Sequence, residues 1–330
     1  MRLRSPVLPL LAALAVVPVG AMTPPVVSAS PAATFDLQAH RGGRGEHTEE
    51  SLYGYAKSIE LGVTTLELDI ALTRDGVPLV WHDPDLQAAK CADTRPATPG
   101  DPQFPYVGKD IHTLSYKQVQ TVVCSKKLPD FPDAYVVPNN RIATLPQLFA
   151  LEKTYPGATV RYDIETKIEA EKRYRTAQPE QFVSAILGAA RAADRLDRIE
   201  IESFDWRSLP LVKAQAPRVP TVALYDATTW RPGSRWLDGA TYEKYSGDVV
   251  AAAKSIGAAV LSPDFALSDP ALVRRAHAAG LKVLPWTVDD PGDIRAQVAA
   301  GVDGIITDYP TRARAVLSTL GKSVPAGAHR

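Results

Sequence analysis

Residues 38–51 carry the stretch QAHRGGRGEHTEES, which completes a short apolar run from Phe35 to Ala39. A helical pattern begins near Ser51, at the end of the stretch. A strand, a glycine-rich polar turn and a helix in this order are typical of the place where an α/β protein exposes catalytic groups. The glycines let backbone N–H groups approach an anion, and the following helix N-terminus adds partial positive charge. The turn therefore presents His40 and Arg41 as candidates, with a packed core histidine as the alternative for His40.

The next segment predicts a β-hairpin. Residues alternate between apolar and polar from Val63 to Leu72, and Asp75-Gly76 then precedes a second apolar run. Alternation followed by Asp-Gly and an apolar run is the strongest short-range hairpin signal. If Asp75-Gly76 forms a two-residue turn, Asp69 lies opposite His82, and these two side chains gather with Glu67 at one end of the hairpin.

The rest of the chain alternates strands with helices. The predicted strands are 35–39, 64–70, 159–164, 198–203, 220–225, 258–262, 282–288 and 304–307. The predicted helices are 52–62, 145–155, 180–193, 206–214, 249–256, 270–279, 291–300 and 311–320. Eight strands that alternate with helices predict an α/β fold of the TIM (β/α)8 barrel type. An open doubly wound sheet is the alternative, but no GxGxxG follows a strand to support it.

The amino terminus has the layout of a secretory signal peptide. Basic residues precede an uncharged apolar run from Val7 to Val19, and small residues continue to Ala33. The run is short for a membrane span, so a retained anchor is the weaker alternative. We therefore expect residues 1–33 to be a leader and 34–330 a single domain that is secreted or periplasmic. No stable membrane span is expected after cleavage.

The charge composition limits the kinds of molecule that the protein is expected to bind. Lys plus Arg number 37 and Asp plus Glu number 37, so the formal net charge is zero. A chain without excess positive charge is a poor candidate for a nucleic-acid-binding protein. A small-molecule substrate is the expected partner.

A long insertion follows the hairpin at about residues 84–140. It is rich in Pro, Asp and Lys, and its apolar periodicity is too poor to predict a core of its own. Both cysteines of the chain, Cys91 and Cys124, lie within it. In an exported protein they favour a disulfide, which would close a loop of about 30 residues and contribute roughly 3–4 kcal/mol in the chain-entropy model.

Three carboxylates lie at the ends of strands that should be neighbours: Glu67, Asp69 and Glu165. Like charges at this spacing raise one another's pKa and cost stability. A hard divalent cation resolves the repulsion, and an all-oxygen ligand set favours Mg²⁺ or Ca²⁺. The alternative is structural, with either glutamate forming a salt bridge to Arg161, Lys167 or Arg74.

Two histidines, His40 and His82, converge on the same end of the predicted barrel. Such a pair suits general acid and base catalysis near neutral pH, and two independent structural histidines are the alternative. Arg41 and Lys167 supply positive charge for a phosphate. Without a serine or cysteine nucleophile, this set points to phosphodiester chemistry.

The chain also resembles a known family. The shared motifs are His40-Arg41-Gly42, Glu67-Leu68-Asp69, residues 73–80 leading into His82-Asp83, Glu165-Thr166-Lys167, Ser203-Phe204-Asp205, Trp286-Thr287-Val288 and residues 301–308. In this order, from residue 37 to about 316, they resemble the glycerophosphodiester phosphodiesterases. The resemblance implies a TIM barrel that uses Ca²⁺ or Mg²⁺ to hydrolyse glycerophosphodiesters to an alcohol and glycerol 3-phosphate.

The resemblance also implies roles for individual residues. By their positions in the motifs, Glu67, Asp69 and Glu165 match metal ligands, His40 and His82 match catalytic histidines, and Arg41, Lys167 and Trp286 match substrate or phosphate contacts. The long insertion corresponds to a segment that shapes the substrate mouth in many members.

The sequence departs from the family after the glycine turn. The family usually has Pro-Glu-Asn-Thr where this chain has Thr48-Glu49-Glu50-Ser51. Glu49 keeps the acid and is a candidate to touch the metal or orient His40, with a charge at a helix N-terminus as the alternative. Arg44 and His47 add charged or titratable groups to the turn, and Arg44 is a candidate phosphate or headgroup contact.

Three functional hypotheses follow. The leading one is a secreted, metal-dependent glycerophosphodiesterase. The second keeps the chemistry but acts on lysophospholipids or cell-wall glycerol-phosphate polymers, which export and the aromatic loop with Trp230 and Trp236 support. The third is a catalytically silent barrel that binds phosphodiesters, against which the histidines and carboxylates argue.

Overall fold

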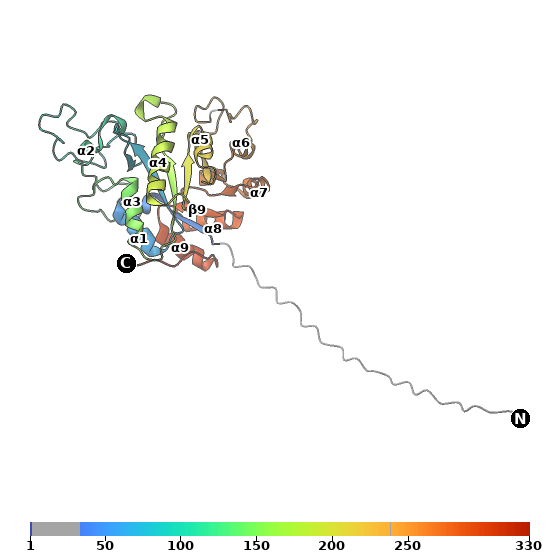
Figure 1. The fold of residues 1–330 in the computed structure, drawn as a ribbon. Helices are drawn as coiled ribbons and strands as arrows, with labels where there is room; N and C mark the ends of the chain where they lie inside the picture. The colour runs from blue at the N-terminus through green and yellow to red at the C-terminus, as the bar shows by residue number, and fades with distance from the viewer. Residues whose placement is uncertain (2–33, 238) are drawn as a thin grey trace. The chain divides into compact units, whose positions relative to one another are not determined.

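The core of the fold is a parallel sheet that winds into a barrel (Figure 1). A computed structural model describes Met1, residues 34–237 and residues 239–330, so the predicted leader at 2–33 lies outside the described residues. The strand order is β8-β7-β6-β5-β4-β2-β1-β9, and β3 pairs antiparallel with β2. The strands are β1 (Asp36–Ala39), β2 (Thr65–Leu72), β3 (Pro78–Val80), β4 (Arg161–Thr166), β5 (Ile199–Ser203), β6 (Thr221–Tyr225), β7 (Val260–Pro263), β8 (Lys282–Val283) and β9 (Gly304–Thr307).

The barrel closes between β8 and β9. β8 is shorter than the predicted strand 282–288 because Pro285 has no N–H to donate to a ladder. Backbone hydrogen bonds nevertheless continue beyond it: Ile306 N–H donates to Pro285 O at 3.0 Å, and Val288 N–H donates to Ile306 O at 2.9 Å. These bonds confirm the predicted TIM barrel and exclude the open sheet.

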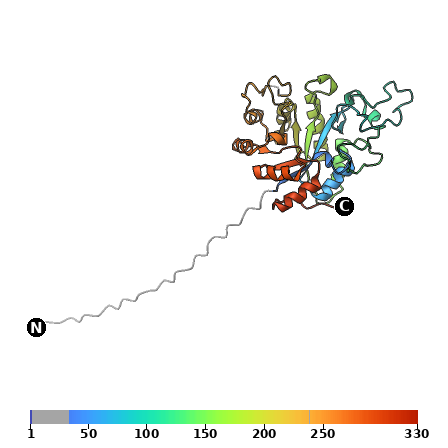
Figure 2. The same cartoon turned by 180° about the vertical axis from the view of Figure 1, so that it is seen from behind.

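The helices lie around the outside of the strands, as Figure 1 and the reverse view in Figure 2 show. They are α1 (Leu52–Leu61), α2 (Tyr116–Val119), α3 (Leu145–Glu152), α4 (Pro179–Ala193), α5 (Ser208–Gln215), α6 (Val249–Ser255), α7 (Pro270–Ala278), α8 (Pro291–Ala300) and α9 (Pro310–Thr319). Local signals set their ends. Ser51 caps α1 by accepting from Gly54 N–H at 3.0 Å, and Gly62 ends the helix with a φ of 86°. No helix in the described ranges is both long and apolar enough to span a bilayer.

The register of the β2–β3 hairpin differs by one residue from our prediction. Ile70 pairs with Val80, and Trp81 N–H donates to Asp69 O at 2.9 Å, so Asp69 lies opposite Trp81 and not His82. The predicted register is wrong because the turn contains three residues, 74–76, and not two.

Side-chain bonding within the turn explains the extra residue. Thr73 N–H donates to Val77 O at 3.2 Å, while Thr73 Oγ1 accepts from Val77 N–H at 2.9 Å. Gly76 closes the turn with a φ of 76°, a left-handed conformation that glycine adopts freely. His82 therefore lies just past the ladder but still at the same end of the barrel as Asp69.

The insertion has a small hydrophobic core, contrary to our prediction. Leu86, Tyr106 and Leu114 are fully buried and cluster with Leu79 and Trp81 of the hairpin. The segment projects from one side of the barrel (Figure 1). Periodicity did not reveal this core because its apolar residues come from irregular loops and from one face of the hairpin. The predicted disulfide between Cys91 and Cys124 is present, with both cysteines buried in the same cluster.

The inner face of the barrel is lined with carboxylates. Residues two apart share a strand face, so Asp163 and Glu165 of β4 point inward with Glu200 and Glu202 of β5, while Tyr162 packs against the helices. Glu200 is 4% exposed and accepts from Gln38 Nε2 at 3.4 Å. Burial, together with the nearby Asp36 carboxylate, raises the pKa of Glu200 to about 7.

We expect Glu200 to make stability depend on pH. A carboxyl whose pKa is raised by folding contributes stability below its ordinary value near 4.5 and loses it as pH rises through about 7. The group should lower the free energy of unfolding by up to about 3 kcal/mol over this range. Urea unfolding from pH 4.5 to 8 should therefore show a flatter profile for Glu200→Gln than for the wild type. Glu180→Gln, on an exposed position of α4, is the control, and identical slopes for wild type and Glu200→Gln would contradict the prediction.

Candidate active site

A cavity of about 330 Å³ opens at the carboxyl ends of the strands. This volume lies within the range of small-molecule sites. Its walls include these predicted residues: His40, Arg41, Arg44, Glu67, His82, Glu165, Lys167 and Trp286. Asp69 is not itself a lining residue, but it contacts two of them, Arg41 and Lys167. The fold thus brings together side chains that lie up to about 250 residues apart in the sequence.

The glycine-rich turn shapes the first wall. After β1, Arg41 adopts a φ of 51° and Gly42 a φ of 75°, left-handed conformations that turn the chain sharply. A Cβ on Gly42 would lie 3.1 Å from Tyr55, and this tight contact together with the positive φ favours glycine. Arg41 N–H donates to Glu67 Oε2 at 2.8 Å, which fixes the turn against β2.

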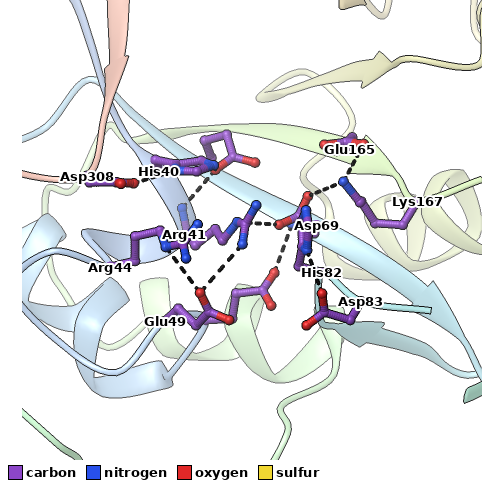
Figure 3. Close-up of polar contacts among 12 residues, drawn as sticks. His40, Arg41, Arg44, Glu49, Asp69, His82, Asp83, Glu165, Lys167 and Asp308 are labelled. Carbon is purple, nitrogen blue, oxygen red and sulfur yellow. Dashed lines mark hydrogen bonds and ion pairs between the residues drawn. The ribbon is translucent and has the colours of Figure 1, made fainter. Parts of the chain in front are cut away.

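His40 is held by an aspartate from the last strand. Its Nδ1 hydrogen-bonds the carboxylate of Asp308, and its Nε2 lies 3.9 Å from Glu67 Oε2 (Figure 3). Burial lowers the pKa of His40 below its ordinary value, although the Asp308 carboxylate acts in the opposite direction. The lowered pKa favours the neutral imidazole, and in the tautomer that donates Nδ1–H to Asp308 the Nε2 lone pair is free to accept a proton.

His82 has a similar arrangement. Its Nδ1 lies 3.0 Å from Asp83 Oδ1 (Figure 3). Burial, with further contributions from the positive charges of Lys167 and Arg41, lowers the pKa of His82 to about 3. Two neutral histidines, each oriented by an aspartate, therefore face one cavity.

Cations separate the carboxylates of the site. Asp69 pairs in register with Glu165 on β4, and Lys167 Nζ lies 2.8 Å from Glu165 Oε1 and 3.5 Å from Asp69 Oδ1. Arg41 Nε lies 3.0 Å from Asp69 Oδ2 (Figure 3). Burial raises the pKa of Glu165 to about 8, and burial with the charge of Asp69 also raises the pKa of Glu67. Asp69 behaves differently: burial opposes its ionisation, but Lys167 and Arg41 hold its pKa well below the ordinary value.

The donor set suits a hard cation. Within residues 34–237 and 239–330, no three His, Cys, Asp or Glu side chains are arranged to enclose a metal ion. The predicted alternative, a structural salt bridge, is present at Glu165, which pairs with Lys167. Arg161, another predicted partner, pairs with Asp36 instead. Buried carboxylates on adjacent strands that raise one another's pKa are nevertheless the hard oxygen donors that Mg²⁺ and Ca²⁺ prefer. The chemistry of the donor set therefore suits a divalent cation, although the described side chains are not arranged around one.

Glu49 is surrounded by cations. Its carboxylate lies 3.5 Å from Arg41 Nη1, 3.2 Å from Arg44 Nε and 2.5 Å from Lys90 Nζ. The carboxylate that orients His40 is that of Asp308.

Sequence reasoning did not select four supporting residues as site residues: Glu50, Asp83, Lys90 and Asp308. Asp83 and Asp308 were detectable because each lies within a motif, next to His82 or at the end of the last strand. Glu50 accepts from Asp69 N–H at 3.2 Å, and Lys90 comes from the insertion. No local sequence pattern marks either Glu50 or Lys90 as a residue of the site.

Part of the cavity wall is aromatic. The Trp286 ring meets the Phe204 ring edge to face, with centroids 5.3 Å apart, and Trp286 Nε1 donates to Ser262 O at 3.1 Å. Both rings line the cavity, and Lys167 Nζ lies 5.9 Å from the Phe204 centroid. The predicted Trp286 is therefore an apolar contact surface beside the charged groups.

Known proteins are similar to this chain in sequence. A family model described as the glycerophosphoryl diester phosphodiesterase family matches residues 40–312. A glycerophosphodiester phosphodiesterase of Caldanaerobacter subterraneus subsp. tengcongensis is 28% identical over 274 residues, which cover 82% of this chain and 93% of that protein. The human protein named lysophospholipase D GDPD3 is 24% identical over 320 residues, which cover 88% of each chain.

Solved structures share the fold. A protein of Silicibacter pomeroyi DSS-3 assigned to the same activity superposes with a TM-score of 0.77 at 29% identity, over 89% of this chain and 96% of that one. An Oleispira antarctica phosphodiesterase in complex with the product sn-glycerol-3-phosphate gives a TM-score of 0.64 at 20% identity, over 86% of this chain and 97% of that one. Because the family model spans most of the chain, this chain belongs to the glycerophosphoryl diester phosphodiesterase family.

Proposed function

We propose that this family member is a secreted, metal-dependent enzyme that hydrolyses glycerophosphodiesters to an alcohol and glycerol 3-phosphate, with His40 and His82 transferring the protons. The observation that carries the proposal is the pair of histidines, each bonded to an aspartate, that line one cavity together with Arg41, Arg44 and Lys167. Family membership supports the reaction, and the geometry supports the roles of the residues.

The cavity is suited to a phosphodiester monoanion. Arg41, Arg44 and Lys167 line it and concentrate positive charge where the phosphate would bind. Phe204 and Trp286 add an apolar part to the wall, beside Lys167. A substrate bound in this cavity would share it with both histidines.

Each histidine is prepared for proton transfer. Because Nδ1 bonds a carboxylate, Nε2 is the atom that exchanges a proton with the substrate. One histidine removes the proton of the attacking oxygen, which belongs to water or to the 2-hydroxyl of the glycerol. The other must first take up a proton on its Nε2, which the negative charge of a bound phosphodiester favours, and it then delivers that proton to the departing alcohol oxygen and returns to the neutral form. The aspartates stabilise the imidazolium that forms in between.

The metal would be held by Glu67, Asp69 and Glu165. When bound, Ca²⁺ or Mg²⁺ supplies Lewis-acid polarisation of a phosphoryl oxygen. Export is proposed from the leader-like composition of residues 1–33 and the disulfide between Cys91 and Cys124, which is typical of oxidising compartments.

Lysophospholipids are the second candidate substrates. Similarity to the protein named lysophospholipase D GDPD3 supports them, and the aromatic wall offers an apolar surface for an acyl chain. Cell-wall glycerol-phosphate polymers would use the same chemistry. The catalytically silent barrel is disfavoured by the intact pair of oriented histidines.

Activity should require both the histidines and a divalent cation. We expect glycerol 3-phosphate release from glycerophosphocholine to stop in EDTA and return with Ca²⁺ or Mg²⁺. His40→Ala and His82→Ala should each lower kcat by about 10²- to 10⁴-fold, the range of general acid–base catalysis. His277→Ala, at an exposed histidine on α7, is the matched control. Choline release from lysophosphatidylcholine, whose other product is lysophosphatidic acid, and glycerol 3-phosphate release from teichoic acid distinguish the substrates, and full activity of His40→Ala would sink the proposal.

Asp308 should matter through His40. Asp308→Asn keeps the shape but removes the charge that stabilises the His40 imidazolium, so we expect kcat to fall by about 10²-fold or more while KM changes little. Steady-state kinetics with glycerophosphocholine measure both constants, and the thermal midpoint checks the fold. A rise in KM at constant kcat would instead assign Asp308 to substrate binding.

A further inference from the structure

The insertion contributes a largely buried cation, Lys90, to the network around the site. Lys90 Nζ forms ion pairs with the carboxylates of Asp83 and Glu49, the latter at 2.5 Å. Its side chain is 13% exposed, and those of Asp83 and Glu49 are 11% and 5% exposed. Charge-assisted bonds between such poorly solvated groups are short and strong, and removing one partner leaves the others uncompensated.

The two oxygens of Asp83 have different partners. Oδ1 lies 3.0 Å from Nδ1 of His82, and Oδ2 bonds Lys90 Nζ. With both oxygens engaged, the carboxylate cannot rotate about its bond without breaking a contact. Lys90 therefore fixes the acceptor that sets the orientation and tautomer of the His82 ring.

Glu49 extends the same network to the opening turn. It joins Lys90 to Arg41, whose Nε lies 3.0 Å from Asp69. The segments that carry His40 and His82 are therefore linked through one ammonium group. Since Lys90 touches neither the cavity nor a histidine, its effect must pass through Asp83 and Glu49.

The backbone around Lys90 is well anchored. Cys91 follows directly and is bonded to Cys124, and Ala92 exchanges two backbone hydrogen bonds with Val123, at 2.8 and 3.0 Å. Lys90 Nζ also lies 5.3 Å from the centroid of the Trp81 ring. The disulfide-bonded part of the insertion thus holds the lysine in place beside the hairpin that carries His82.

We propose that Lys90 is a positioning residue for catalysis, acting through Asp83 to hold His82 in its reactive orientation. The inference rests on the proposed role of His82 as a proton-transfer group. It gives the insertion a part in the chemistry itself, in addition to any part in shaping the substrate mouth.

Kinetics of Lys90 variants test the proposal in the full-length enzyme. Lys90→Met should lower kcat about 10- to 100-fold, the usual cost of removing an outer-shell partner, while KM stays within about twofold. Lys90→Arg should recover most of kcat because a guanidinium can still bridge two carboxylates. Lys117→Met, an exposed lysine of α2 in the same insertion, should match the wild type. An unchanged kcat in Lys90→Met, or no recovery in a folded Lys90→Arg, would overturn the proposal.

A double-mutant cycle tests the route through Asp83. If Lys90 acts through that carboxylate, Lys90→Met combined with Asp83→Asn should lower kcat no further than Asp83→Asn alone. Multiplicative losses would overturn the route. If Lys90→Met does not fold, Lys90→Gln takes its place in the cycle, and the comparison of Lys90→Arg with wild type remains decisive.

A spectroscopic measurement separates this inference from the proposed function. In ¹⁵N-histidine-labelled protein, the His82 resonances, assigned by their loss in His82→Ala, should report an Nδ1-protonated ring in the wild type and a mixture of tautomers in Lys90→Met. Unchanged resonances in Lys90→Met would overturn positioning. If His82→Ala were fully active while the resonances still shifted, the proposed catalytic role of His82 would fail and the contact itself would stand.

Discussion

The structure of the site depends on the balance between buried carboxylates and two cations. Asp69 is 1% exposed and stays ionised because Arg41 and Lys167 approach it from opposite sides, at 3.0 and 3.5 Å. Without them, ionised carboxylates on neighbouring strands would repel one another in a poorly solvated interior. Burial and, after it, the charges of Lys167 and Arg41 lower the pKa of His82, so the same cations help to keep that imidazole neutral.

Each element of the barrel supplies a different group of side chains to the site. The strands bring carboxylates to one level of the barrel, the glycine turn brings a cation and His40, and the loop after β3 brings His82. Aspartates from the last strand and from that loop then orient the rings. The insertion adds Lys90 from outside the barrel, which connects this peripheral segment to the aspartate that bonds His82.

The sequence predicted much of this because several signals were local. Alternating apolar residues and strand–helix order indicated the barrel, and residues at strand ends indicated His40, Glu67, Asp69 and Glu165. The hairpin register was wrong because side-chain bonding by Thr73, which adds a residue to the turn, leaves no trace in the apolar pattern. The core of the insertion was missed for a related reason, since its apolar residues have no period.

By itself, then, the sequence determined the order of strands and helices, the identity of the groups at the strand ends and the pairing of Cys91 with Cys124. Only the tertiary structure decided which charges meet: that Lys167 lies between Glu165 and Asp69, and that Glu49 and Asp83 share Lys90. Periodicity and turn chemistry act over a few residues, so a chain can specify them locally. Ion pairs between segments distant in sequence depend on barrel closure and loop packing, which no local pattern encodes.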